Sequence, residues 1–145
     1  LRAAHVPCVI SQYKANIICP ETLEENLPVA QANGSGFICF SPLAQGLLTD
    51  RYLNGIPEGS RASKNVFLRP EQITDEAVAR AQRLGAIAAE RGQTLAQMAV
   101  LWLLAQDVTS VIVGASSVKQ LDDNLQAINN ITFTDEEIKE IARVR

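Results

Sequence analysis

The chain has 145 residues, which is enough for one domain with an apolar core. Its formal charge of -3 and the lack of any basic block argue against a surface for nucleic acid or anionic membranes. No stretch approaches the roughly 18 apolar residues that span a membrane, and no signal region is recognisable. Because the chain starts at Leu1 rather than Met, we expect a fragment or a trimmed product that begins inside a fold.

Apolar runs separated by turn residues predict a chain in which strands and helices alternate. The expected strands cover residues 7–12, 36–40 and 109–113. Capping boxes, in which a hydroxyl residue precedes Glu or Gln by three positions, predict helix starts at Thr22, Thr94, Ser117 and Thr134. An amphipathic helix over 74–91 and a buried helix over 95–105 separate the second and third strands. Pro28 is expected to restart or kink the first helix.

The long segment 42–70 has no apolar periodicity and contains several glycines, prolines and asparagines. A loop of this length in a compact domain is usually a functional lid or disordered. The alternation of strands and helices predicts an α/β fold with parallel strands. Three strands cannot close a barrel and leave two open edges. We therefore expect self-association or pairing with a missing amino-terminal half.

Cysteine and histidine usage predicts neither disulfides nor a metal site. Three cysteines make an odd count without metal-ligand spacing. Cys8 and Cys39 fall in expected strands, and we interpret these and Cys19 as small buried residues in a reducing cytoplasm. The single histidine, His5, precedes the first strand and is expected to be a surface residue.

Two motifs at the carboxyl ends of the second and third strands are the most informative part of the sequence. The first reads Ser-Pro-Leu-Ala-Gln-Gly over 41–46, and the second places Gly-Ala-Ser at 114–116 before Leu121, Asn124 and Leu125. With this spacing, the chain resembles the aldo-keto reductases over essentially its whole length, in particular their glyceraldehyde-phosphate reductase and potassium-channel β-subunit branches. The resemblance implies the C-terminal half of a (β/α)8 TIM barrel, strands 6–8 with their helices, so that residues 1–145 form a single partial domain.

In such barrels the loops after strands seven and eight commonly hold a phosphate group. The resemblance implies that the first motif wraps the pyrophosphate of an NADPH cofactor. The matching residues are Ser41, Leu43, Gln45, Gly46 and Arg51. Hydroxyl groups and backbone amides suit phosphate oxygens, and the glycine permits a close approach. The alternative is that Ser41-Pro42 is only the turn that ends a strand.

The resemblance also implies that the second motif holds the adenosine end of the cofactor. The matching residues are Gly114, Ser116, Gln120, Asp123 and Asn124. The last three share one helical face, so they can converge on one ligand. Lys119 is the only full positive charge nearby, and with Ser116 we expect it to favour the 2′-phosphate of NADPH. The alternative is that Ser117 and Gln120 only cap the helix, although both roles are compatible.

The first strand matches the family less well. The family pattern Gln-x-x-Tyr-Asn is met by Gln12 and Asn16, and the resemblance implies that Gln12 holds the nicotinamide amide. Ala15 stands where the family has a tyrosine that stacks on the nicotinamide ring. Tyr13 is a possible replacement, but a shift of one residue points a strand side chain to the opposite face.

The family's catalytic Tyr, Lys, Asp and His all come from the first half of the barrel, so we assign no catalytic residue here. We expect part of a cytoplasmic, NADPH-dependent oxidoreductase that reduces aldehydes or ketones, with the isolated chain inactive. The alternative is a non-catalytic, nucleotide-sensing interaction protein like the channel β-subunits, which Ala15 favours. A third interpretation is a phosphate-binding barrel half from another family.

Overall fold

The computed structural model describes residue 6, residues 8–65 and residues 67–145. His5 lies outside the described residues, as does part of the first predicted strand. Three parallel strands form one sheet in the order of the sequence. They are β1 (Ile10–Lys14), β2 (Gly36–Phe40) and β3 (Ser110–Val111). Gln12 lies opposite Ile38, which in turn lies opposite Ser110.

Two of the three strands differ from their predicted bounds because pairing, rather than composition, sets where a strand ends. β1 begins at Ile10, three residues later than predicted, because Ile10 pairs with Gly36, the first residue of β2. β3 is only two residues long, since it pairs with Ile38 and Cys39 near the end of β2. β2 has the predicted bounds.

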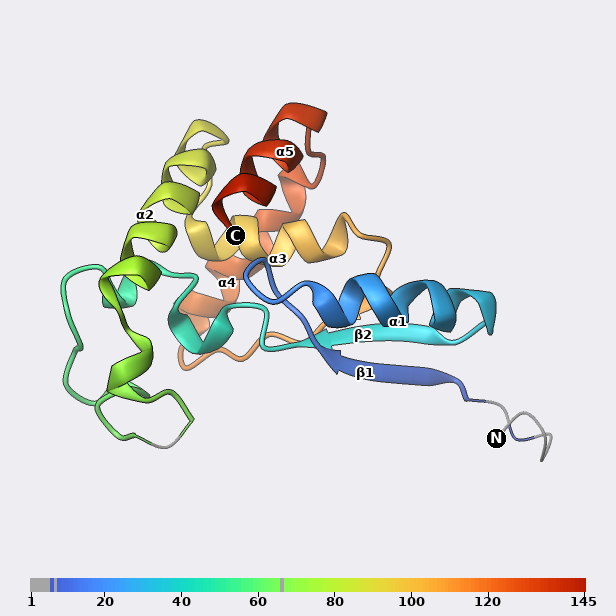
Figure 1. Ribbon diagram of the computed structural model, residues 1–145, viewed down its shortest axis with the longest axis horizontal. Helices are drawn as coiled ribbons and strands as arrows, with labels where there is room; N and C mark the ends of the chain where they lie inside the picture. Colours follow the sequence, from blue (N-terminus) through green and yellow to red (C-terminus); the bar gives the residue numbers. More distant parts are fainter. Residues whose placement is uncertain (1–5, 7, 66) are drawn as a thin grey trace.

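Five α-helices lie above and beside the sheet in Figure 1 and leave its other face uncovered. They are α1 (Glu21–Ala32), α2 (Asp75–Glu90), α3 (Leu95–Leu104), α4 (Val118–Gln126) and α5 (Asp135–Val144). Short 3-10 turns occur at Ala44–Gly46, Asp50–Tyr52, Pro70–Gln72 and Ala127–Asn130. No helix in the described part of the chain combines the length and the apolar character needed to cross a membrane.

The capping boxes at Thr94 and Thr134 are confirmed, with reciprocal side-chain bonds to Gln97 and Glu137. The predicted box at Thr22 is wrong. Helix α1 already begins at Glu21, and Pro20 precedes it without a side-chain cap. Pro28 lies inside α1, so it neither ends nor restarts the helix.

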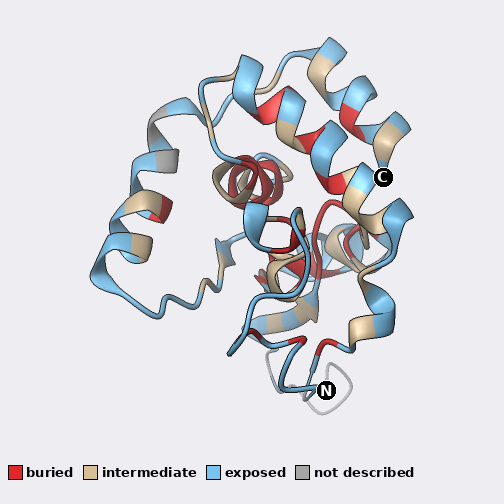
Figure 2. Ribbon diagram, turned by 90° about the vertical axis from the view of Figure 1, so that its left-hand side faces the viewer, coloured by how far each residue is buried: buried red, intermediate tan, exposed pale blue. Residues whose placement is uncertain are grey.

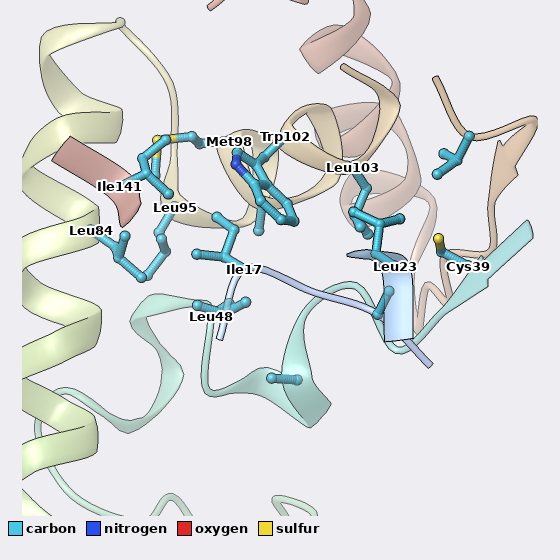
Figure 3. Close-up of a cluster of buried hydrophobic side chains, with 14 of the residues drawn as sticks. Ile17, Leu23, Cys39, Leu48, Leu84, Leu95, Met98, Trp102, Leu103 and Ile141 are labelled. Atoms are coloured by element: carbon cyan, nitrogen blue, oxygen red, sulfur yellow. The ribbon is translucent and has the colours of Figure 1, made fainter. Parts of the chain in front are cut away.

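The core lies between one face of the sheet and the helices. Figure 2 shows the buried residues gathered at the centre of the molecule. In Figure 3, Cys39 of β2 lies near Leu103 of α3, and Trp102 extends toward Ile17. Helix α3 is the most buried helix because almost every residue in it is apolar. The other face of the sheet is open and exposes Ile10, Phe40 and Ile112.

Part of the long segment 42–70 packs on itself. Tyr52, Ala62 and Leu68 are buried in a small apolar cluster of their own. Among the described residues of this segment, the predicted lack of regular structure is confirmed apart from short 3-10 turns.

The three cysteines differ in burial, and all are free thiols. Cys39 is buried and Cys19 is half-buried, but Cys8 is exposed. The expectation of burial is therefore wrong for Cys8, which precedes β1 and has no sheet partner. Burial raises the pKa of the Cys39 thiol to about 11.

Candidate functional site

A cleft of about 1130 Å³ lies at the carboxyl ends of β2 and β3. Its walls come from the loop after β2, the start of α3, and the segment that leads from β3 into α4. Among the predicted site residues, those that line it are Ser41, Leu43, Gln45, Gly46, Arg51, Gly114, Ser116, Gln120, Asp123 and Asn124. The two motifs, far apart in sequence, thus face one common space.

Gln12 is the one predicted site residue that does not line this cleft. It lies in the middle of β1, on the open face of the sheet, and its side chain is exposed. Tyr13 occupies the opposite face, where its ring stacks on Phe37 with centroids 5.0 Å apart and an angle of 18°. The idea that Tyr13 replaces the missing tyrosine is therefore wrong, because its ring is part of the core.

The backbone of the 41–46 turn is unusual. Ser41, Ala44 and Gln45 have φ values of 61°, 44° and 61°, in the left-handed region that residues other than glycine seldom adopt. The Ala44 N–H donates to Ser41 O at 3.1 Å, and the Gly46 N–H donates to Leu43 O at 2.8 Å. Strained conformations of this kind cluster at ligand-binding turns.

Two glycines of the cleft serve different purposes. Gly46 has a φ of 106°, which favours glycine, and a Cβ there would lie 3.1 Å from Cε2 of Tyr52, a tight contact that the ring would have to yield to. A Cβ on Gly114 would meet nothing within 4 Å. Packing within the chain does not demand glycine at 114.

Arginine side chains dominate the positive charge of the cleft. Arg51 and Arg61 both line it, and neither makes an ion pair with any described residue. Lys119 does not line the cleft, and its Nζ contacts Oδ2 of Asp123 at 2.8 Å on the exposed side of α4. The hydrogen bond and the charge of Asp123 raise the pKa of Lys119. Sequence reasoning missed Arg61, which only its place in the same irregular loop could have suggested.

The start of α4 is capped, but not as predicted. Oε1 of Gln120 accepts hydrogen bonds from the Ser116 N–H at 2.8 Å and the Ser116 hydroxyl at 3.1 Å. The Gln120 N–H donates to Oγ of Ser117 at 3.2 Å. A capping box at Ser117 predicts that the Gln120 side chain accepts from the Ser117 N–H. It accepts instead from Ser116, one residue earlier. A phosphate that uses the Ser116 donors would have to displace the Gln120 side chain.

The cleft wall contains one acceptor and one donor that lack partners. Oε1 of Gln45 and Nδ2 of Asn124 are buried, and neither has a hydrogen-bond partner among the described residues. Asn124 is only 8% exposed. A buried polar group without a partner is unfavourable. These two atoms therefore fit a polar ligand with both donors and acceptors, which a dinucleotide offers.

Helix α3 supports the α4 side of the cleft through Gln97. Its Oε1 accepts from the Thr94 N–H at 2.9 Å, and its Nε2 donates to the Asp123 carbonyl at 2.7 Å. One side chain thus caps α3 and fixes α4 beside it. The sequence indicated only the cap, since the link to α4 depends on tertiary packing.

The two tyrosines lie away from the cleft, and residues 6, 8–65 and 67–145 contain no group arranged to hold a metal ion. The tyrosines are Tyr13, which is stacked on Phe37, and Tyr52, which is 3% exposed in the loop cluster. Neither lines the cleft. That part of the chain also contains no group of three His, Cys, Asp or Glu side chains arranged to hold a metal ion.

Comparison with known proteins agrees with this arrangement. A family profile described as "Aldo/keto reductase family" matches residues 1–145. The chain belongs to this family. It is 44% identical over 147 residues to an L-glyceraldehyde 3-phosphate reductase of Escherichia coli K12, and the match covers 97% of this chain and 42% of that protein. It is 34% identical over 128 residues to a probable voltage-gated potassium channel subunit beta of Arabidopsis thaliana, covering 85% and 39%.

Solved structures show the same fold. The chain superimposes on the glycerol dehydrogenase AKR11B4 from Gluconobacter oxydans with a TM-score of 0.76 and 22% identity, covering 98% of this chain and 43% of that one. For the holo form of aldo-keto reductase AKR11C1 from Bacillus halodurans, the TM-score is 0.69 and the identity 28%, covering 94% and 42%. The chain thus spans about two fifths of the length of the relatives it matches.

Proposed function

We propose that this chain is the C-terminal half of the (β/α)8 barrel of an NADPH-dependent oxidoreductase that reduces aldehydes or ketones. In this proposal the cleft binds the pyrophosphate and the adenosine phosphate of the cofactor. The observation that carries it is the meeting of the 41–46 turn and the 114–124 segment in one cleft, in a member of the aldo/keto reductase family. The unpartnered atoms of Gln45 and Asn124 support a polar ligand there.

Each part of the cleft has a role in this proposal. The backbone of the 41–46 turn would receive the pyrophosphate, and the unpaired Arg51 and Arg61 would neutralise its charge. Gly114 leaves room for the ligand, while Gln120 and Asn124 would contact its adenosine end. When bound, NADPH supplies the hydride that reduces a carbonyl group. Gln12 would hold the nicotinamide amide only where the rest of the barrel brings the ring over β1.

The isolated chain is expected to be inactive on carbonyls. Hydride delivery leaves an alkoxide, which needs a positioned proton donor. Neither Tyr13 nor Tyr52 can be that donor, because both rings are packed away from the cleft. The donor would come from the part of the family's barrel that this chain does not match.

The open surfaces of the chain support pairing with that part. Ile10, Phe40 and Ile112 are exposed on the open face of the sheet. Exposed apolar residues also follow the helical period along one side of α4, namely Val118, Leu121 and Leu125, and Ile128 of the next 3-10 turn is exposed as well. Apolar patches of this kind mark association surfaces. We expect a complementary amino-terminal half, or a second copy in its absence, to cover them, and the three free thiols support a cytoplasmic location.

The test is NADPH oxidation with a panel of aldehydes. The purified chain is assayed alone, and then mixed with the unmatched amino-terminal part of an aldo/keto reductase. Turnover only in the mixture is the expected result. Turnover by the chain alone would mean that a catalytic group lies within it. If the mixture forms a complex that neither binds NADPH nor oxidises it, the proposal is wrong.

The second candidate is a non-catalytic, nucleotide-sensing interaction protein. It is favoured by Ala15, which stands in place of the family's stacking tyrosine and is fully buried, and by the relatives named as channel β-subunits. One measurement distinguishes the two candidate functions. A reconstituted barrel that binds NADPH tightly but does not oxidise it with any aldehyde in the panel supports the sensor.

A further inference from the structure

Asn16 is a fully buried polar residue just beyond the end of β1, and it is outside the set of predicted site residues. Its backbone is fixed in both directions, because its N–H donates to Cys19 O at 3.4 Å and its carbonyl accepts from the Cys19 N–H at 3.1 Å. One residue earlier, the Ala15 N–H donates to Phe40 O at 3.3 Å. The end of β1 is thereby tied to the end of β2.

The side chain of Asn16 continues this link into the cleft-forming turn. Its Nδ2 donates to the Ser41 carbonyl at 3.1 Å, and the same carbonyl accepts the Ala44 N–H at 3.1 Å. Ser41 has a φ of 61°, which is unfavourable for a serine. The carbonyl is therefore held from two sides while its own residue is in a strained conformation.

We propose that Asn16 is a positioning residue, whose amide holds the 41–46 turn in the shape that receives a pyrophosphate. The identity of the ligand rests on the proposed function, but the role of the hydrogen bond does not. Asn16 does not line the cleft, so it acts through Ser41. Without the Nδ2 donor, Ser41 would relax toward negative φ, and the conformations of Ala44 and Gln45 would lose their anchor.

The chain offers a matched control in Asn26. Its Nδ2 also donates to a backbone carbonyl, that of Thr22, at 3.1 Å, but within α1 and away from the cleft. Asn26→Ala removes the same kind of bond as Asn16→Ala. A purely structural role for Asn16 predicts that neither variant has a local effect on the turn beyond its effect on global stability.

The first experiment is amide hydrogen exchange on the full 145-residue chain. The reporters are the turn amides of Ala44 and Gly46, which donate within the turn. After correction for global stability measured with urea, Asn16→Ala should speed their exchange about tenfold relative to wild type. Exchange in α3 should not change, and Asn26→Ala should leave the turn amides as they are. Equal acceleration throughout the chain, or none in the turn, would overturn the proposal.

Two further substitutions test whether the lost hydrogen bond and the strained Ser41 conformation account for the result. Asn16→Leu has nearly the size of asparagine but has no hydrogen-bond donor, so it should open the turn as Asn16→Ala does. Ser41→Gly removes the conformational cost at that position, because glycine adopts positive φ freely. Adding it to Asn16→Ala should restore much of the lost protection. If Asn16→Ala does not fold, recovery of folding in the double variant supports the proposal, and failure to recover it argues against the proposal.

The second experiment separates this role from the proposed function. NADPH contains a pyrophosphate, whereas 2′-AMP carries only the adenosine and its 2′-phosphate. Asn16→Ala should weaken NADPH binding about tenfold and leave 2′-AMP binding unchanged. Equal loss for both ligands would contradict a role at the 41–46 turn. If the wild-type chain binds neither ligand, the proposed function fails, and hydrogen exchange still decides the role of Asn16.

Discussion

Arg91 should be among the most important single side chains for the stability of this chain. It lies at the C-cap of α2, and its side chain is only 3% exposed. Its NH1 contacts Oε2 of Glu137 at 2.6 Å, and its guanidinium carbon lies 3.8 Å from the centre of the Phe133 ring. NH2 donates to the carbonyls of Asn130 and Thr132 at 3.1 Å and 3.0 Å. Arg91 therefore fixes α5 and the turn before it onto the end of α2.

The expected loss in Arg91→Ala follows from these contacts. Removing one partner of a buried ion pair costs about 3–5 kcal/mol, and the ring contact adds roughly 1 kcal/mol. The side chain of Glu137 is 25% exposed, so water recovers part of the loss. We expect the free energy of unfolding to fall by about 3 kcal/mol. At about 2–4 °C per kcal/mol for a chain of this size, the melting temperature falls by about 6–12 °C.

Urea unfolding followed by the fluorescence of Trp102, the single and buried tryptophan, measures this loss. Arg80 of the same helix is the control, because its NH2 contacts Oε1 of Glu76 at 3.1 Å on the surface. Arg80→Ala should cost less than about 1 kcal/mol. Equal losses for the two variants would refute the reasoning, since the buried contacts of Arg91 would then contribute nothing beyond a surface pair.

The same contact makes stability depend on pH. Burial alone would raise the pKa of Glu137, but hydrogen bonds from Thr134 and the Arg91 guanidinium outweigh it and lower the pKa below its ordinary value. The stability that Glu137 contributes is therefore fully present above its unfolded pKa of about 4.3. It is lost as the pH falls through the lower folded pKa. The difference between wild type and Arg91→Ala should shrink correspondingly in acid.

Three further predictions concern the cleft, the long loop and the thiols. Lys119→Ala should change the preference for NADPH over NADH less than about threefold, because Lys119 does not line the cleft and its charge is paired with Asp123. Arg51→Ala should weaken the binding of both cofactors about tenfold. Titration of both cofactors compares the variants, and a large selective loss in Lys119→Ala would contradict this prediction. Limited proteolysis should cleave the chain at the exposed residues 54–59, and this cleavage should slow when NADPH binds. Equal cleavage with and without NADPH would count against a loop that the ligand orders. At pH 8, iodoacetamide should modify the exposed Cys8 well before the buried Cys39, whose pKa is about 11. Peptide mass spectrometry measures the order of modification. Early labelling of Cys39 would contradict the prediction and show that β2 opens.

Local signals in the sequence predicted the elements whose ends are set locally. The boxes at Thr94 and Thr134 fix helix starts through residues three positions apart. β2 was predictable because a run of apolar residues ends in Ser41-Pro42. The start of β1 was not, since it depends on where Gly36 begins to pair. The sequence contains no local sign of a partner 26 residues away.

The candidate site, like the fold, has parts that the sequence predicts and parts that depend on tertiary structure. The two motifs could be recognised from the sequence, and the structure brings them to one cleft. The pairing of Lys119 with Asp123 could have been suspected from their spacing of four residues on a helix. The links from Asn16 to Ser41 and from Gln97 to the Asp123 carbonyl could not, because each joins separate elements. Supporting contacts of this kind become visible only with the tertiary structure.

The shortness of β3 has a consequence for the order in which the cleft forms. Backbone pairing joins the turn after β2 to the segment before α4 through β3. There the Phe37 N–H donates to Oγ1 of Thr109 at 3.0 Å, and the N–H groups of Thr109 and Ile112 donate to Phe37 O and Cys39 O at 2.8 Å. Closing the chain between residues 37 and 109 carries an entropy cost that these few bonds must offset. The helical pair α2–α3 involves only local closure, so we expect it to form first. The ability to bind a ligand should then be the last property gained in folding. A ligand that contacts both walls would hold them together, as a longer β3 paired with β2 would.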